Sequence, residues 1–120
     1  MAIALAGSLG ALARYGLDGF VSRRTSGAFP WGTFAVNISG AFVLGLVFTL
    51  ATERWGLAPW LRSGITIGFL GAYTTFSTFM LESYRLASDR ALGLAAANVL
   101  GSCAVGLVAV YLGIVAARAM

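Results

Sequence analysis

The stretch Gly68–Phe79, with the sequence GFLGAYTTFSTF, decides how this chain of 120 residues folds. It lies in Ser63–Leu81, a run without charged residues that is close to the roughly 20 mostly apolar residues a transmembrane helix needs. The stretch holds two glycines and four Ser or Thr residues, and glycines beside a threonine pair can allow a helix to break. Such a break survives in a bilayer only where it is buried in protein or lines a cavity. The alternative is a continuous helix whose hydroxyls bond back to their own carbonyls.

Further candidate spans lie on both sides of this stretch. Two other charge-free runs, Thr25–Thr52 and Ala91–Ala117, are long enough to cross a bilayer. A fourth candidate, Ala2–Val21, contains Arg14 and Asp18, which stand four residues apart and can pair on one helix face. We find no repeat or linker. The sequence therefore predicts an all-α membrane protein, with four transmembrane helices in a single domain covering residues 1–120.

The composition agrees with a membrane protein and excludes most enzymes. Hydrophobic residues make up 59% of the chain and charged residues only 10%, against about 25% in a soluble domain. There is no histidine, and the single cysteine, Cys103, cannot form an internal disulfide. The arginines are scattered between apolar runs, which is unlike a nucleic-acid-binding face. We expect a multi-pass protein of the cell membrane with no enzymatic activity and no nucleic-acid partner.

The distribution of arginines leaves the orientation in the membrane undecided. With four spans, three arginines of the flanking segments fall on one side and four on the other, so the positive-inside rule selects neither direction. One interpretation is a chain that inserts both ways and pairs antiparallel with a second copy. The other is a monomer of fixed orientation with a weak charge bias. The two sets are Arg54, Arg62 and Arg118 on one side, and Arg23, Arg24, Arg85 and Arg90 on the other.

Polar and aromatic residues in the spans are candidates for a pathway. Phe76 and Phe79 stand three apart on one helix face, where they either pack or present their positive ring edges to an anion. Thr75 and Thr78 add hydroxyl donors to the same segment. Asn37, inside the second span, either joins helices or offers its NH₂ group to an anion.

Three motifs, taken together, resemble the CrcB/Fluc fluoride channels. They are GALARY (Gly10–Tyr15), GTFAVNISG (Gly32–Gly40) and GAYTTFSTF (Gly71–Phe79), and they occur in the order that the family has. The resemblance covers essentially the whole chain. It implies a fluoride-selective channel that exports fluoride across the cell membrane to relieve toxicity. It also implies an antiparallel, dual-topology homodimer with two fluoride pores and a structural Na⁺ at its centre.

The resemblance also assigns roles to individual residues. Phe76 and Phe79 match the family's pore phenylalanines, and Asn37 matches its pore asparagine. The backbone carbonyls of Gly71 and Thr74 match the positions that coordinate the central Na⁺. The remaining matches are Arg14 and Glu82 as charges of the vestibule and pore end, and Thr33 and Ser102 as members of a polar track, with Asn98 nearby.

Two other kinds of protein fit part of the pattern. A small multidrug transporter, which exchanges drugs for protons, is also short, has four spans and can insert both ways. That class has an essential carboxylate in the middle of its first span, whereas this chain has only Arg14 and Asp18, near the far end. A structural assembly subunit, whose polar residues only hold helices together, is the second alternative.

Overall fold

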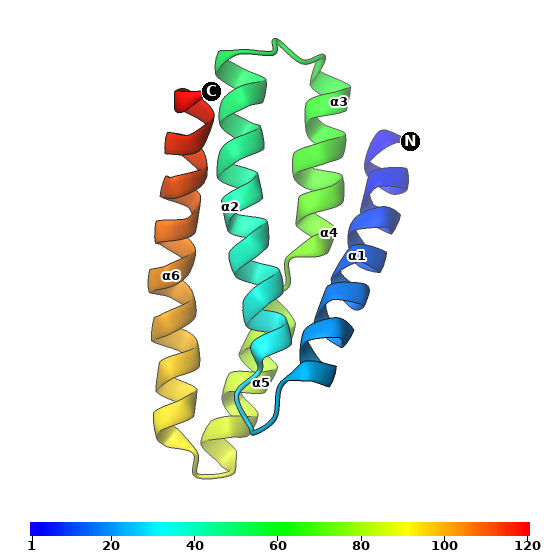
Figure 1. Ribbon diagram of the computed structural model, residues 1–120. Coiled ribbons are helices and arrows are strands. Elements are labelled where there is room, and N and C mark those ends of the chain that lie inside the picture. The colour runs from blue at the N-terminus through cyan, green and yellow to red at the C-terminus, as the bar shows by residue number, and fades with distance from the viewer.

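The computed structural model describes residues 1–120, and all of its regular structure is helical (Figure 1). The helices pack side by side as rods of a bundle, and both termini lie at the same end of it, which also holds the connection 54–58. Three rods are single helices, and the fourth is built from short pieces. The helices are α1 (Ala2–Arg24), α2 (Trp31–Glu53), α3 (Pro59–Ser63), η1 (Gly64–Leu70), α4 (Gly71–Tyr73), α5 (Phe76–Ser88) and α6 (Leu92–Ala119).

Three rods are long and apolar enough to cross a membrane, which confirms three of the four predicted spans. They are Trp31–Glu53, Pro59–Ser88 and Leu92–Ala119, and we call Pro59–Ser88 the third span. The third span extends past the predicted Ser63–Leu81 because its helices include charged residues at both ends. The chain is thus a multi-pass membrane protein. α1 has 23 residues, which is sufficient length, but its composition is too polar to identify it as a span.

The third span is interrupted, as the glycine and threonine pattern predicts. Thr74 has φ −80° and ψ 156°, and Thr75 has φ −145° and ψ 114°, so both residues are extended between α4 and α5. The alternative of a continuous helix is therefore wrong. Gly71 itself remains helical, and the break lies at the threonine pair that follows it. The segment before the break, η1, is a π-helix, a rare form that is frequent near functional sites.

Glycines allow α2 and α6 to pack closely. A Cβ atom on Gly45 would collide with the backbone carbonyl of Val110, and one on Gly113 with the carbonyl of Phe42. Small residues that let backbones approach are typical of helix pairs in membranes, where association depends on close packing.

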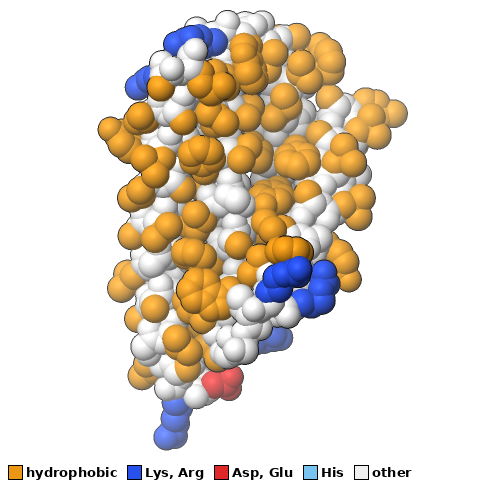
Figure 2. All heavy atoms as spheres, viewed as in Figure 1, with side chains coloured by type: hydrophobic (Ala, Val, Ile, Leu, Met, Phe, Trp, Pro, Cys, Tyr) orange, Lys and Arg blue, Asp and Glu red, His pale blue; other side chains and the backbone are white.

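Apolar side chains cover most of the visible surface, and arginines gather towards the two ends of the molecule (Figure 2). One ion pair is present, between Arg118 and Glu53 at 2.9 Å, and it joins the last turns of α6 and α2. The expected pairing of Arg14 with Asp18 does not occur: Arg14 donates to the carbonyl of Ala72, and Asp18 accepts a hydrogen bond from Ser22. A surface that is apolar along its length and basic at both ends suits a protein that spans a bilayer.

Candidate functional site

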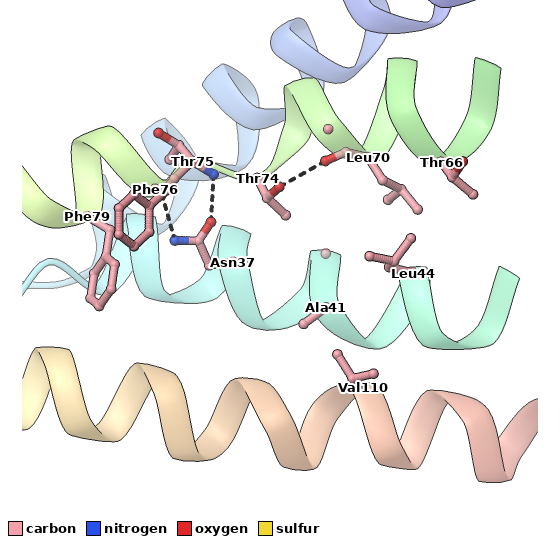
Figure 3. A pocket seen from close by; sticks show the side chains of 12 residues that line it. Asn37, Ala41, Leu44, Thr66, Leu70, Thr74, Thr75, Phe76, Phe79 and Val110 are labelled. Carbon is pink, nitrogen blue, oxygen red and sulfur yellow. Dashed lines mark hydrogen bonds between the residues drawn. The ribbon is translucent and has the colours of Figure 1, made fainter. Parts of the chain in front are cut away.

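The break opens onto a groove of about 330 Å³ between α2, α6 and the third span (Figure 3). Gly40 and Ala41 line it from α2, and Val110 lines it from α6. The groove brings together residues that are far apart in the sequence and that the motifs single out. These are Asn37, Gly71, Thr74, Thr75, Phe76 and Phe79.

The side-chain amide of Asn37 pairs with the backbone at the break. Its Nδ2 donates to the carbonyl of Thr75 at 3.0 Å, and its Oδ1 accepts from the Thr75 N–H at 2.8 Å (Figure 3). Asn37 therefore supplies the donor and acceptor that Thr75 would have found in an uninterrupted helix. An amide NH₂ carries two hydrogens, and only one of them has a partner within the chain.

The threonine pair ends one helix and begins the next. Thr74 donates its hydroxyl and its N–H to the carbonyl of Leu70, at 3.0 and 3.1 Å. Thr75 is the N-cap of α5, because its Oγ1 accepts from the N–H of Thr78 at 3.4 Å. The Thr75 hydroxyl donates to no group within the chain, so its proton has no partner there.

Several backbone carbonyls at the break have no hydrogen-bond partner, those of Gly71 and Thr74 among them. No backbone or side-chain donor reaches the carbonyl oxygens of Gly71 and Thr74, and both residues line the groove. Between them in sequence, the carbonyl of Ala72 accepts from Arg14 Nε at 3.2 Å. This places the positive charge of Arg14 at the carbonyl end of α4, where a cation is favourable.

The two phenylalanines occupy different environments. The ring centroids of Phe76 and Phe79 lie 6.2 Å apart with an angle of 67° between planes, so the rings meet edge to face. The predicted neighbour relation is confirmed. Phe79 is only 6% exposed, whereas Phe76 is 73% exposed. Both side chains line the groove, next to Asn37 (Figure 3).

Thr33 and Glu82 form a hydrogen bond with each other outside the groove. Thr33 donates to Glu82 Oε1 at 2.9 Å, and this bond joins α2 to α5. The other carboxylate oxygen, Oε2, is buried and has no hydrogen-bond partner. Neither residue lines the groove, and Thr78 does not line it either.

Ser102 belongs to a buried network rather than to the groove. It donates to Asn98 Oδ1 at 3.3 Å, and Asn98 Nδ2 donates to Ser83 Oγ at 2.9 Å. Ser83 in turn donates to the carbonyl of Phe79 at 2.8 Å. Ser83 is not among the residues predicted from the sequence. Its spacing of four residues from Phe79 was the available signal, but spacing alone does not reveal a partner on another helix.

Comparisons with known proteins agree on one family. The sequence model of a family described as "CrcB-like protein, Camphor Resistance (CrcB)" matches residues 1–114. A protein of Geotalea uraniireducens named Fluoride-specific ion channel FluC is 51% identical over 118 residues, which are 98% of this chain and 95% of that protein. The protein of the same name from Geotalea daltonii is 52% identical over 116 residues, which are 97% of this chain and 94% of the relative. The protein of the same name from Geobacter sulfurreducens is 48% identical over 118 residues, which are 98% of this chain and 95% of the relative.

Proposed function

The chain belongs to the CrcB-like family, and from this premise we propose that it is a fluoride-selective channel that exports fluoride across the cell membrane and so relieves fluoride toxicity. It is a membrane protein and not an enzyme. The observation that carries the proposal is the groove at the break, which places Asn37, Thr75 and the two phenylalanines around one space.

Fluoride is small and strongly hydrated, so a selective route must replace its water with donors. The second N–H of Asn37 and the free hydroxyl proton of Thr75 are two such donors at the groove. The edges of the Phe76 and Phe79 rings carry partial positive charge and can face an anion. The hydrogen bonds at the break hold Asn37 and Thr75 in place, so these two donors need little reorganisation when an anion arrives.

The remaining matched residues extend this route. The fixed charge of Arg14 lies beside the break and attracts anions towards it. Glu82, with Thr33 bound to it, marks the other end of the pathway on α5. Thr78 of α5 and Ser102 of α6 lie outside the groove, and in this proposal they belong to a polar track that continues from it.

We propose that the channel is an antiparallel, dual-topology homodimer with two pores, in which α1 is the fourth span of each chain. The groove is open rather than enclosed, and the exposed ring of Phe76 needs a cover, which a second copy would provide. The nearly even division of arginines between the two ends supports insertion in both directions.

The free carbonyls of Gly71 and Thr74 fit a Na⁺ at the centre of that dimer. Their oxygens have no other partner, and both residues line the groove. No group of three or more Cys, Asp or Glu side chains could hold a metal ion instead. When bound, Na⁺ would supply a positive charge that compensates these carbonyl dipoles.

Flux measurements on purified protein in lipid vesicles test the proposed function. We expect rapid fluoride release, when K⁺ leaves through an ionophore, and no chloride release above that of protein-free vesicles. Fluoride release that requires an opposing proton gradient, or drug uptake driven by one, would instead identify an exchanger. Vesicles that release no anion under any gradient would identify an assembly subunit, and either result would overturn the proposal.

A further inference from the structure

The rotation of α5 about its axis is not determined by α4, the helix before it. Because Thr74 and Thr75 are extended, the helical hydrogen bonds of α4 do not continue into α5. Bonds from other helices hold α5 instead, and those from α2 reach Thr75 and Glu82. Which side chains of α5 face the groove must therefore be fixed by contacts with other helices. The buried residues of α5 are Phe79, Ser83 and Leu86, and their spacing places them on one face. The middle residue of this buried face is polar.

Ser83 meets a buried polar partner on α6. Asn98 is only 1% exposed, and its Nδ2 donates to Ser83 Oγ at 2.9 Å. Because Ser83 Oγ accepts this bond, its own proton is directed to the carbonyl of Phe79 at 2.8 Å. Ser102 completes the chain of bonds by donating to Asn98 Oδ1. Donor and acceptor of the Asn98 amide are thus both engaged inside the protein.

The hydrogen bonds of Ser83 and Asn98 depend on the rotation of α5 about its axis. If α5 turned by one residue, Ser83 would leave Asn98, and the amide would remain without its acceptor among apolar side chains. Buried polar groups without partners are costly, and more so at membrane depth. The bond to the Phe79 carbonyl also acts on the backbone of the same residue whose ring lines the groove, since such bonds to the fourth preceding carbonyl bend a helix.

We propose that Asn98 and Ser83 are positioning residues of the pore: Asn98, acting through Ser83, fixes the rotation of α5 and thereby the place of Phe79 at the groove. This inference rests on the proposed function, because it assigns a conducting role to Phe79. Asn98 acts towards the interior of the bundle in this account, not as a ligand of the anion.

The test compares variants of α5 and α6 in the vesicle flux assay, with flux expressed per folded protein. Ser83→Ala removes both bonds of the Ser83 hydroxyl, and Asn98→Leu removes the amide at similar volume. Ser83→Thr retains the hydroxyl. Ser88→Ala is the control, because Ser88 is exposed on α5 and its side chain makes no hydrogen bond.

We expect Ser83→Ala and Asn98→Leu to lower fluoride flux by about tenfold or more and to raise chloride flux relative to fluoride. Ser83→Thr should keep more than about half of the parent flux, and Ser88→Ala should equal the parent. In a Phe79→Ile background, adding Ser83→Ala should change flux by less than about twofold, because the ring it positions is already gone.

The positioning role would be overturned if Ser83→Ala had the same fluoride flux and selectivity as the parent. It would also be overturned if the fold-loss of flux in the Ser83→Ala, Phe79→Ile double variant equalled the product of the losses in the two single variants. Ser83→Ala decides the matter alone if Asn98→Leu does not fold. A parent protein that releases no fluoride would overturn the proposed function itself, and the positioning role with it. Fluoride release by the parent combined with an inert Ser83→Ala would overturn only the positioning role.

Discussion

Asn37 shows how one side chain can serve both the fold and the site. Its amide has a donor and an acceptor like those of a peptide group. With them it forms the hydrogen bonds that the N–H and carbonyl of Thr75 lack where the helix is interrupted. The two interpretations of Asn37 that the sequence allows, a link between helices and a donor to an anion, are therefore compatible. The link is confirmed by the structure, and the donor role stays a prediction.

Asn37→Asp separates these contributions by charge. The carboxylate still accepts from the Thr75 N–H, but it loses the donor to the Thr75 carbonyl and adds a negative charge at the groove. A like charge about 4 Å away costs about 4 kcal/mol near a protein surface, so we expect fluoride flux to fall by at least about a hundredfold. Ser88→Asp adds the same charge at the exposed end of α5 and should leave flux unchanged. Equal flux in Asn37→Asp and the parent, both folded, would remove Asn37 from the pathway.

Replacement of either phenylalanine by isoleucine tests conduction against packing. Isoleucine keeps apolar bulk but has no positive ring edge. We expect Phe76→Ile and Phe79→Ile each to lower flux per folded protein by about tenfold or more, equivalent to about 1.4 kcal/mol in the barrier. Size-exclusion chromatography checks that the assembly is intact. Flux within about a factor of two of the parent would show that the rings only pack.

At the scale of the element, the break in the third span depends on space as well as on hydrogen bonds. Gly40 of α2 faces Thr74 and Tyr73, and a Cβ atom at Gly40 would collide with the Thr74 methyl group. The hydroxyls of Ser39 and Tyr73 also meet, at 2.8 Å. α2 thus holds the break through a small residue and two polar side chains, Asn37 and Ser39.

Gly40→Ala should therefore destabilise the protein, although alanine is a better helix former than glycine. Overpacking at a tight contact costs about 1–3 kcal/mol, which exceeds the gain in helix propensity of about 1 kcal/mol. Gly16→Ala is the matched control, because nothing lies within 4 Å of a Cβ atom on Gly16 of α1. The measurement is the fraction of protein that stays folded after stepwise heating, judged by size-exclusion chromatography. Equal loss in both variants would contradict the account.

Local features of the sequence predict the elements better than they predict the contacts between them. The glycines and the threonine pair predict the break to within a few residues, because helix interruption depends on local chemistry. The pairing of Asn37 with Thr75 spans 38 residues, and no local signal contains it. Arg14 illustrates the same limit: its spacing favours Asp18, but the free carbonyl of Ala72 is its partner in the fold.

At the scale of the whole molecule, one copy presents an open groove and an apolar surface, with positive charge at both ends. These features explain why the arginine count does not select an orientation. They also suit a protein whose two copies lie in opposite directions, since a given end then faces one aqueous phase in one copy and the opposite phase in the other, and neither end needs an excess of positive charge. The antiparallel dimer is the central claim of the proposed function.

Fluoride flux from copies of fixed orientation tests this claim most directly. Several lysines added near Arg23 and Arg24 trap one orientation, and lysines added near Arg54 and Arg62 trap the opposite one. We predict that each trapped variant, expressed alone in cells, gives less than about a tenth of the parent's fluoride export, and that coexpression of the two restores it. Full export by either trapped variant alone would contradict the antiparallel dimer.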